Sequence, residues 1–572
     1  MIQIACNFIQ LKFEKLKNHF LHKKLLLIPL IFIFIILALL GTNFYPGEKL
    51  QYIVFSIHAY ILLYFGLAQR FSFFFLFLSI FLWLGFWFKL TIHTVFNYPF
   101  VEPVGSFLGS GNEWDQLLLT ADVAFCGVIL GGVIAAGILG ADKKLNVFLV
   151  KLPAPWWYFH IRKSLWAVLL LAIVIVAMTN IYFGVHQVGI VSRTIFYFPV
   201  NAVISWLLNI GLATCIATLV WWDISIRRPL GLSAYAILFE AFFSSISIMS
   251  RAAYVFHAIP QFFALKKNIG DWTLSKKILF IFVFAMGLML SISAVSSIRN
   301  YLYQTDYLMS TEYQGVYAQW EVLSGRKNAL IKMHENILDY ELRKKYQAEI
   351  NKINEQLSIL APQMQEAEKK FSELRSGSNS QIYLLANEFG YHIAYGSFMR
   401  IFQLAIDRWI GLEGLMATEA YSEKGLTLFL ASLSRRSDIK SSDSYQKISM
   451  SIYMKPSDVF SFRSLPGIVA FMNYSGSKLL VFTGMFLVVV VFIFVERGIF
   501  YSSGNPIVTS LYSAELANNI AQFGGDPLQT LKYFLILIMG LGCIVFINSD
   551  LLNRLLDQLG VTPAHAIDEG KR

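Results

Sequence analysis

Long apolar runs constrain this chain more than any other feature of its sequence. A helix of about 20 apolar residues crosses the ~30 Å hydrocarbon core of a bilayer. Only 15% of the 572 residues are charged, against about a quarter in soluble domains. We therefore expect an all-α, polytopic helical membrane protein. The apolar runs cover 25–40, 71–88, 117–139, 165–185, 204–222, 230–249, 278–298, 479–495 and 534–547, with 52–68 as a more polar tenth.

The distribution of lysine and arginine predicts the orientation of these spans, because positive charge favours the cytoplasmic side. A basic stretch precedes the first run, and no small-x-small cleavage site follows it, so we expect an uncleaved span and a cytoplasmic N-terminus. Basic clusters at 143–163, 227–228 and 266–277 are expected on the same side. The loops 42–51, 89–116 and 186–195 are poor in positive charge and are expected outside.

The basic clusters 227–228 and 266–277 are both expected on the cytoplasmic side, but only one obvious span, 230–249, lies between them. An even number of crossings must separate two segments on the same side, so we expect 252–265 to cross back. With that crossing, we expect 11 or 12 spans, depending on whether 505–523 spans, re-enters or lies at the interface. The predicted organisation is an N-terminal bundle at 1–298, a large external loop at 299–475 and a C-terminal membrane segment with its tail at 476–572. The loop carries 20 Lys/Arg and 19 Asp/Glu, so nearly all of the net charge of +11 lies elsewhere.

The external loop contains a helical segment at 330–375. Its apolar seam repeats with heptad spacing and is flanked by charges, which is typical of helix–helix packing. We expect either a hairpin that packs on itself or a coiled coil with a second subunit or partner, and Pro362 should kink or restart the helix. The segment 381–465 is expected to fold against the membrane surface. The seam comprises Tyr346, Ile350, Ile353, Leu357, Leu360, Met364, Ala367, Phe371 and Leu374.

Signatures of soluble enzymes and of cofactor sites are absent from the sequence. The cysteines are scattered without a CxxC pair, which favours small core residues over a disulfide or thiolate site. The sequence contains no nucleotide-binding glycine pattern, HExxH, GxSxG or zinc-ligand spacing. We therefore expect no metal, no cofactor and no nucleic-acid partner.

Arginines occur where three helices are expected to emerge on the outer face: Arg193, Arg251 and Arg299. A charge so close to hydrocarbon is costly unless it is paired or faces a water-filled cavity. The plainer alternative is that each side chain snorkels to headgroup phosphates. The guanidinium fork stays charged and bonds two oxygens at once, which suits a pyrophosphate. The short turn around Arg251 makes it the strongest candidate for such a contact.

Carboxylates form the second group of candidates. Glu240 lies inside an expected span, and Glu102 lies among aromatic residues in the external loop 98–116. The large loop carries DRWIGLEGLMA, with Asp407, Arg408 and Glu413. An acid beside aromatic rings is suited to sugar binding and to general-base catalysis on a hydroxyl. A surface or interfacial acid is the ordinary alternative for each.

Taken together, these features resemble the bacterial O-antigen polymerases, which polymerise oligosaccharide repeat units and belong with the O-antigen ligases among the GT-C membrane glycosyltransferases. The likeness rests on the many-spanned frame with one large late loop, on Ser250-Arg251 at an outer helix end, and on RWIGLEGLMA followed by PGIVAFMNYSGS. It covers most of the chain in architecture and only short stretches in sequence.

The resemblance implies an enzyme of the bacterial inner membrane with its large loop in the periplasm. It would transfer the growing glycan from undecaprenyl pyrophosphate to the hydroxyl of a fresh lipid-linked repeat unit. Arg251 would bind the pyrophosphate, with Arg408, Arg299 and Arg193 as further contacts. Glu413 would be the general base, with Glu102 as the second choice.

Alternatives from other classes remain open at this stage. The chain could be an O-antigen ligase-like transferase, or a flippase or transporter of lipid-linked oligosaccharides, which Glu240 favours. A chain-length regulator would explain the heptad segment but needs only two spans. The same segment could instead bind such a regulator or a second copy of the chain.

Overall fold

The computed structural model of the chain describes residues 32–68, 72–98, 100–139, 154–305, 311–336, 340–376, 404, 406–434, 444–450, 463–524 and 527–547. The expectations for the basic N-terminal stretch, for much of 381–465 and for the seam side chains from Ala367 onward lie outside these residues. Within the described residues every regular element is helical, which confirms the predicted all-α architecture.

The helices follow one another along the described chain, and two π-helical segments, η1 and η2, continue directly into α-helices. Their bounds are α2 (Lys49–Ala68), α3 (Phe73–Leu82), η1 (Trp83–Phe88), α4 (Lys89–Phe96), α5 (Gly111–Leu139), α6 (Trp156–Phe183), α7 (Val200–Trp206), η2 (Leu207–Gly211), α8 (Leu212–Ser225), α9 (Gly231–Ser247), α10 (Ala253–Ala264), α11 (Lys266–Gly270), α12 (Leu274–Thr305), α13 (Thr311–Asn336), α14 (Tyr340–Ser376), α17 (Leu412–Glu419), α18 (Leu426–Ser434), α19 (Ser444–Ile448), α20 (Ile468–Asn473), α21 (Lys478–Ser503), α22 (Pro506–Ala521) and α23 (Pro527–Ile547).

Eight helices of the described chain are long and apolar enough to cross a membrane, which supports a membrane protein. Two further apolar helices, Phe32–Phe44 and Gly231–Ser247, are shorter. The eight candidates are Lys49–Leu67, Phe73–Phe96, Gly111–Leu139, Trp156–Phe183, Val200–Ser225, Leu274–Arg299, Lys478–Ser503 and Thr530–Ile547.

Close packing of small residues explains how α5 and α21 associate. Gly127 and Gly131 lie one turn apart on α5, and both face the backbone of α21. A Cβ atom at Gly131 would lie only 2.8 Å from the carbonyl oxygen of Phe486. Such small-xxx-small spacing lets helices approach closely where lipid offers no hydrophobic driving force.

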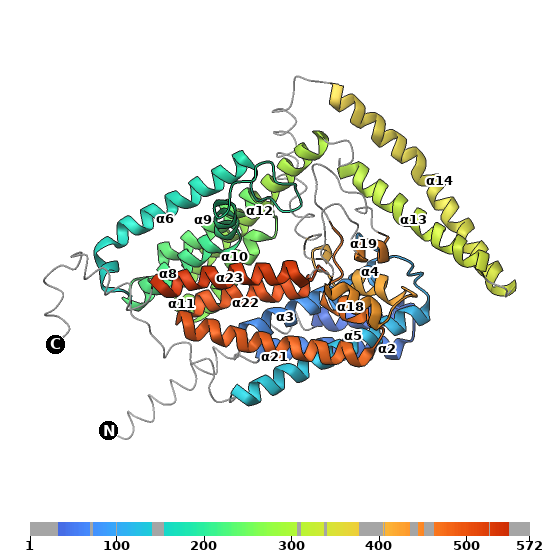
Figure 1. Cartoon of the computed structure of the whole chain (residues 1–572), viewed down its shortest axis with the longest axis horizontal. Helices are drawn as coiled ribbons and strands as arrows, with labels where there is room; N and C mark the ends of the chain where they lie inside the picture. Colours follow the sequence, from blue (N-terminus) through green and yellow to red (C-terminus); the bar gives the residue numbers. More distant parts are fainter. Residues whose placement is uncertain are drawn as a thin grey trace.

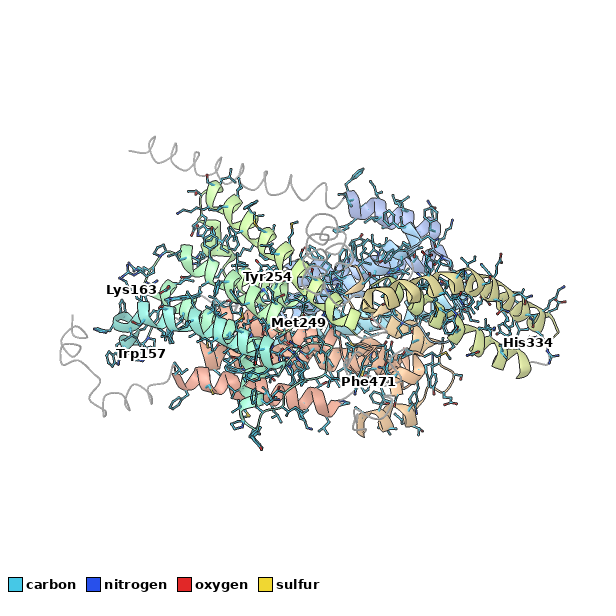
Figure 2. All side chains as sticks on the ribbon, turned by 90° about the horizontal axis from the view of Figure 1, so that it is seen from above. Trp157, Lys163, Met249, Tyr254, His334 and Phe471 are labelled. Carbon is cyan, nitrogen blue, oxygen red and sulfur yellow. The ribbon has the colours of Figure 1, made fainter. Side chains whose placement is uncertain are left out.

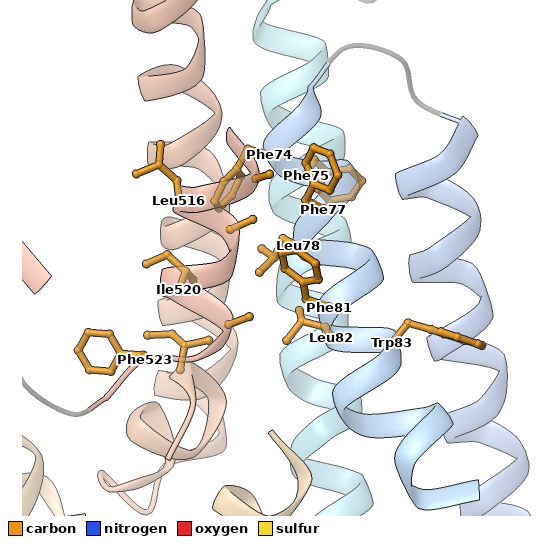
Figure 3. Close-up of a cluster of buried hydrophobic side chains, with 14 of the residues drawn as sticks. Phe74, Phe75, Phe77, Leu78, Phe81, Leu82, Trp83, Leu516, Ile520 and Phe523 are labelled. Atoms are coloured by element: carbon orange, nitrogen blue, oxygen red, sulfur yellow. The ribbon is translucent and has the colours of Figure 1, made fainter. Parts of the chain in front are cut away.

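Helix α22 is largely buried among other helices of the bundle. It packs against α3, α8, α10 and α21, and most of its side chains are buried. Figure 3 shows buried side chains of α3, such as Phe74 and Leu78, in one hydrophobic cluster with Leu516, Ile520 and Phe523. Asn505 caps its first turn by accepting hydrogen bonds from two backbone N–H groups, and Pro506 follows at the position where a missing N–H costs nothing.

The short segment at 252–265 forms helix α10, which packs against α9 and α22 inside the protein. A tight turn joins α9 to α10, with Met249 at a φ of 56°. Because its neighbours are protein helices, α10 does not need the length of a lipid-exposed span. Figure 2 shows Met249 and Tyr254 near the middle of the molecule.

Helices α13 and α14 form a hairpin that projects from one end of the bundle (Figure 1). Leu330, Ile350 and Ile353 are buried between the two helices, and Arg326 bonds to Glu349 at 2.8 Å. His334 lies at the far tip of the hairpin, opposite Trp157 at the other end of the molecule (Figure 2). Of the two effects predicted for Pro362, a kink or a restart, the restart does not occur, since α14 runs through Pro362 as one element. A proline removes a single intrahelical hydrogen bond, which the long helix tolerates.

Candidate functional site

Charged and polar side chains converge at one end of the bundle, which we call the loop end. Here α4, α6, α9 and α12 finish, and α5, α21 and α23 begin. Figure 1 shows the short helices α18 and α19 at this end, beneath the α13–α14 hairpin. Segments between the long helices therefore meet helix ends at this place.

The segment 407–413 enters the bundle because two glycines permit close backbone contact. A Cβ at Gly85, within the π-helix η1, would lie 2.7 Å from the carbonyl oxygen of Ile410. Gly411 adopts a φ of 155°, and the Phe86 ring packs against it. Helix α17 starts directly afterwards, with Leu415 N–H donating to the Gly411 carbonyl at 3.0 Å. This geometry brings Asp407 and Glu413 against α4.

A buried ion pair joins α4 to α17. Lys89 Nζ lies 2.6 Å from Glu413 Oε1 and 2.8 Å from Oε2, and the side chains are 1% and 3% exposed. Lys89 also donates to the Asp407 carbonyl at 3.4 Å. Because Lys89 contacts both oxygens, Glu413 is fixed in place with its charge neutralised.

Asp407 and His93 face each other beside this pair. Tyr98 Oη donates to Asp407 Oδ2 at 3.1 Å, and His93 Nε2 lies 3.9 Å from Asp407 Oδ1. Burial raises the pKa of the Asp407 carboxyl to about 6, against the opposing effects of Lys89 and the Tyr98 hydrogen bond. Among the described residues, neither His93 Nε2 nor Asp407 Oδ1 has a hydrogen-bond partner.

The backbone carbonyl of Tyr98 fixes the tautomer of His93. His93 Nδ1 lies 2.7 Å from this oxygen, which only an N–H can satisfy, so the neutral ring leaves its Nε2 lone pair towards Asp407. The ring is held flat against Phe100, with centroids 4.1 Å apart. Two buried acceptors, His93 Nε2 and Asp407 Oδ1, therefore point to one place, where a hydroxyl can donate a proton.

Glu102 joins the cluster from the loop between α4 and α5. Burial is the main reason that the pKa of Glu102 is raised, and the charge of Glu413 adds to it. Lys89, a hydrogen bond with Ser464 and Arg408 act in the opposite direction. The two predicted acids, Glu102 and Glu413, are thus neighbours in the structure.

Arg408 and Arg299 form the positively charged side of the site. Arg408 Nη1 donates to Gln522 Oε1 at 3.0 Å, at the end of α22. Burial lowers the pKa of Arg408, and the nearby charge of Arg299 acts in the same direction, whereas Glu102 and Glu515 raise it. The structure therefore brings together two of the predicted arginines.

The turn that carries Arg251 is tied to Arg299 through one residue of the loop after α6. Arg299 Nη2 donates to the Val188 carbonyl at 2.5 Å, and the Val188 N–H donates to Ile248 at 2.8 Å. Arg251, half-buried, follows three residues later in the same turn. It therefore lies at the loop end, on the same side of the bundle as Arg299.

Arg193, which the sequence analysis proposes as a further pyrophosphate contact, lies at the C-terminus of α6. Its guanidinium donates to the Ile181 carbonyl at 2.8 Å and its backbone N–H donates to Gly184 at 3.0 Å, at the C-terminus of α6. Gly184 ends that helix with a φ of 61°. A cation near a helix C-terminus interacts favourably with the helix dipole and so stabilises the helix. Within the described chain, Arg193 thus caps the C-terminus of α6.

Sequence reasoning missed Lys89, His93 and Tyr98, because the segment 89–116 was assigned to an external loop. Lys89 follows the apolar run 71–88 directly, and the helix continues to Phe96. A lone lysine at the end of an apolar run, in a segment otherwise poor in positive charge, was the available signal. Within the described chain, no group of three or more His, Cys, Asp or Glu side chains is arranged to hold a metal ion.

Comparisons of this chain with protein-family models, with curated proteins and with solved structures find no match, so the geometry of the site carries the functional conclusion alone.

Proposed function

We propose that the protein is a membrane glycosyltransferase that polymerises undecaprenyl-pyrophosphate-linked oligosaccharide repeat units. The observation that carries the proposal is the pair of buried acceptors, His93 Nε2 and Asp407 Oδ1, held 3.9 Å apart beside Arg408. A transferase of this kind needs a base for the acceptor hydroxyl and fixed positive charge for the leaving pyrophosphate.

In the proposed reaction, the acceptor hydroxyl oxygen attacks the anomeric carbon of the growing glycan. The bond from that carbon to the pyrophosphate oxygen breaks, and undecaprenyl pyrophosphate leaves with the electron pair. The hydroxyl proton passes to the His93 and Asp407 pair. We prefer this pair to Glu413 as the general base, because Lys89 already occupies both oxygens of Glu413.

Glu413 is then a positioning residue, which anchors Lys89 and the segment that carries Asp407. Glu102 adds negative charge next to Arg408 and helps to orient it. Arg408 and Arg299 are the candidates for the pyrophosphate oxygens, with Arg251 at the rim. Their guanidinium groups would gain most from the charge that develops as the pyrophosphate leaves.

The proposal includes the finer topology. The chain would cross the bacterial inner membrane 11 or 12 times, with α9 and α10 as a short crossing pair, and residues 299–475 would lie in the periplasm. A cysteine placed at Ser376 should then react with an impermeant label from outside. Reaction only from the cytoplasmic side would reverse the orientation.

The α13–α14 hairpin is the proposed contact for a chain-length regulator or for a second copy of the chain. It projects beyond the loop end (Figure 1). Its outer surface carries the charged residues that flank the seam.

Genetics gives the first test of the proposed function. Deletion should leave single repeat units on the lipid carrier, still delivered to the outer face, with no polymer ladder. Arg251→Ala should remove the ladder at normal protein abundance, while Arg193→Ala should retain it. An intact ladder in the Arg251 variant would remove that residue from the site.

A flippase or transporter of lipid-linked saccharides is the second candidate. The observation that favours it is an ion pair inside the bundle, between Glu240 and His257. Buried ionisable residues in membrane proteins often mark transport pathways. Accumulation of the lipid-linked repeat unit on the inner face of the deletion strain would favour this function over polymerisation.

A further inference from the structure

One side of α22 is polar and only partly buried. Within this helix, whose residues are all described, every side chain is buried except those of Glu515, Asn518 and Asn519. Gln522, which follows the last turn, is also only partly buried. Their spacing of three and four positions places these four residues on one side of the helix. We call them the α22 polar face, and they extend over about 10 Å of helix.

The α22 polar face leads from the loop end into the bundle. Gln522 Oε1 accepts a hydrogen bond from Arg408 at 3.0 Å, and further in, Tyr533 of α23 donates to Glu515 Oε1 at 2.6 Å. Figure 1 shows α23 beside α22. Helices α3 and α21, which pack on α22, and helix α23 belong to candidate membrane spans. Polar groups among such helices face a space filled by water or ligand rather than lipid.

Hydrogen bonds within the α22 polar face fix its side chains and leave other atoms open. Asn519 Nδ2 donates to Glu515 Oε1 at 2.9 Å, and Gln522 Nε2 donates to Asn518 Oδ1 at 2.7 Å. Within the described chain, no hydrogen bond engages Glu515 Oε2, Asn518 Nδ2 or Asn519 Oδ1. Each of these three atoms remains accessible. The face therefore presents two open acceptors and one open donor in fixed positions.

This combination of groups selects among the chemical classes of ligand. A sugar hydroxyl both donates and accepts hydrogen bonds, so neighbouring hydroxyls of one ring can engage all three open atoms. A phosphate group only accepts, and the open carboxylate oxygen of Glu515 repels its charge. A lipid tail forms no hydrogen bonds and would leave the polar groups unpaired in apolar surroundings. The α22 polar face therefore suits a saccharide.

We propose that the α22 polar face is a saccharide-binding subsite, in which Glu515 Oε2 and Asn519 Oδ1 accept hydrogen bonds from sugar hydroxyls and Asn518 Nδ2 donates one. The identity of the sugar rests on the proposed function: it belongs to a lipid-linked repeat unit whose pyrophosphate lies at Arg408. Since Arg408 bonds directly to Gln522, the pyrophosphate and the sugar attached to it occupy adjacent places. The subsite distinguishes a substrate that carries a glycan from released undecaprenyl pyrophosphate, which carries none.

Equilibrium binding to the purified full-length protein in lipid nanodiscs tests this subsite. The two probes are an undecaprenyl-pyrophosphate-linked repeat unit and undecaprenyl pyrophosphate without sugar. All binding measurements use an Asp407→Asn background, so that the reaction does not consume the first probe. Asn518→Ala removes the open donor, and Asn519→Ala removes one open acceptor, without a change of charge. Each should weaken binding of the sugar-bearing probe about 3–10-fold, the usual effect of one hydrogen bond, and leave binding of the bare lipid within about twofold.

A third alanine variant supplies the matched control. Asn351→Ala, at an exposed position of α14, should leave the affinities for both probes unchanged. Thermal unfolding shows whether each variant is folded. Equal weakening of both probes by Asn518→Ala and Asn519→Ala would overturn the proposal, because it would indicate an effect on the pyrophosphate contact alone. Unchanged binding of the sugar-bearing probe in both variants would also overturn it.

A second measurement does not depend on substitutions of the α22 polar face. A repeat unit with a diazirine on the sugar next to the pyrophosphate is bound to the unsubstituted protein and irradiated, and mass spectrometry identifies the labelled peptides. The label should lie within 506–533, and a label confined to other segments would overturn the proposal. Polymer extension is scored separately. Protein that binds the sugar in this way without extending the glycan would keep the subsite and contradict the proposed function.

Discussion

The ion pair between Lys89 and Glu413 allows the sharpest test of how the candidate site is held together. Nζ lies 2.6 and 2.8 Å from the two carboxylate oxygens, and both side chains are almost fully buried. Removal of one partner leaves an uncompensated buried charge, which destabilises a folded protein by about 3–5 kcal/mol. Because ~1.4 kcal/mol is a factor of ten, we expect Glu413→Gln or Lys89→Met to lower the folded-to-unfolded ratio by about 10²–10⁴-fold.

The double variant Lys89→Met/Glu413→Gln should recover most of this loss, since it buries no net charge. Replacement of a buried pair by neutral groups of similar volume is often close to neutral in stability. The measurement is a double-mutant cycle on the free energy of unfolding of the purified protein. It isolates the coupling between the two side chains.

A partly exposed pair supplies the control. Arg326 and Glu349 also lie 2.8 Å apart, but their side chains are 29% and 28% exposed. Glu349→Gln should therefore cost only about 0–1 kcal/mol. The reasoning would be refuted if Glu413→Gln cost no more than this control, or if the losses of the two single variants simply added in the double variant.

The remaining predictions concern the reacting groups and their supports. Transfer needs Asp407 ionised, so the rate should rise as the pH increases through about 6. Tyr98→Phe removes a hydrogen bond that lowers the pKa of Asp407, so this limb of the pH–rate profile should move to higher pH; an unmoved limb would exclude Asp407 as its origin. Gly85→Ala places a Cβ 2.7 Å from a backbone oxygen and should cost about 1–3 kcal/mol, read from thermal unfolding, whereas Gly137→Ala has open space around it and should cost nothing measurable. Arg193→Ala should lower stability by about 0.3–1 kcal/mol and leave the rate of transfer unchanged, as expected for a helix C-terminal cation; a lost polymer ladder would return this residue to the site.

The all-helical architecture could be predicted because apolar runs of membrane length depend only on local composition. Arg408 and Glu413 could also be named as candidate site residues from the sequence. They are charged residues beside aromatic and apolar residues in a loop that is expected outside the membrane. Local sequence does not show which residues from distant segments contact each other in the folded protein. Lys89 and Glu413 are 324 positions apart, and the backbone of the segment that carries Glu413 approaches η1 closely at Gly85.

For Pro362 and for the segment 505–523, the structure of the folded protein explains what the sequence alone did not predict. Pro362 lies within α14 because a long helix tolerates the loss of one hydrogen bond, although its local propensity predicts a break. The mixed composition of 505–523 left its position open, and burial among α3, α8, α10 and α21 determines it. The position of 505–523 depends on tertiary packing, which cannot be read from a single sequence.

Polymerisation by the purified protein in vitro is the decisive experiment. The purified protein in nanodiscs is supplied with undecaprenyl-pyrophosphate-linked repeat units, and polymer length and released undecaprenyl pyrophosphate are followed together. Wild-type protein should extend the glycan and release one undecaprenyl pyrophosphate for each repeat unit added. Asp407→Asn should slow both by about 10²–10⁴-fold, the usual contribution of a general base, at unchanged unfolding temperature. Extension by Asp407→Asn at the wild-type rate, or movement of the lipid across the bilayer without any extension by the wild type, would contradict the account.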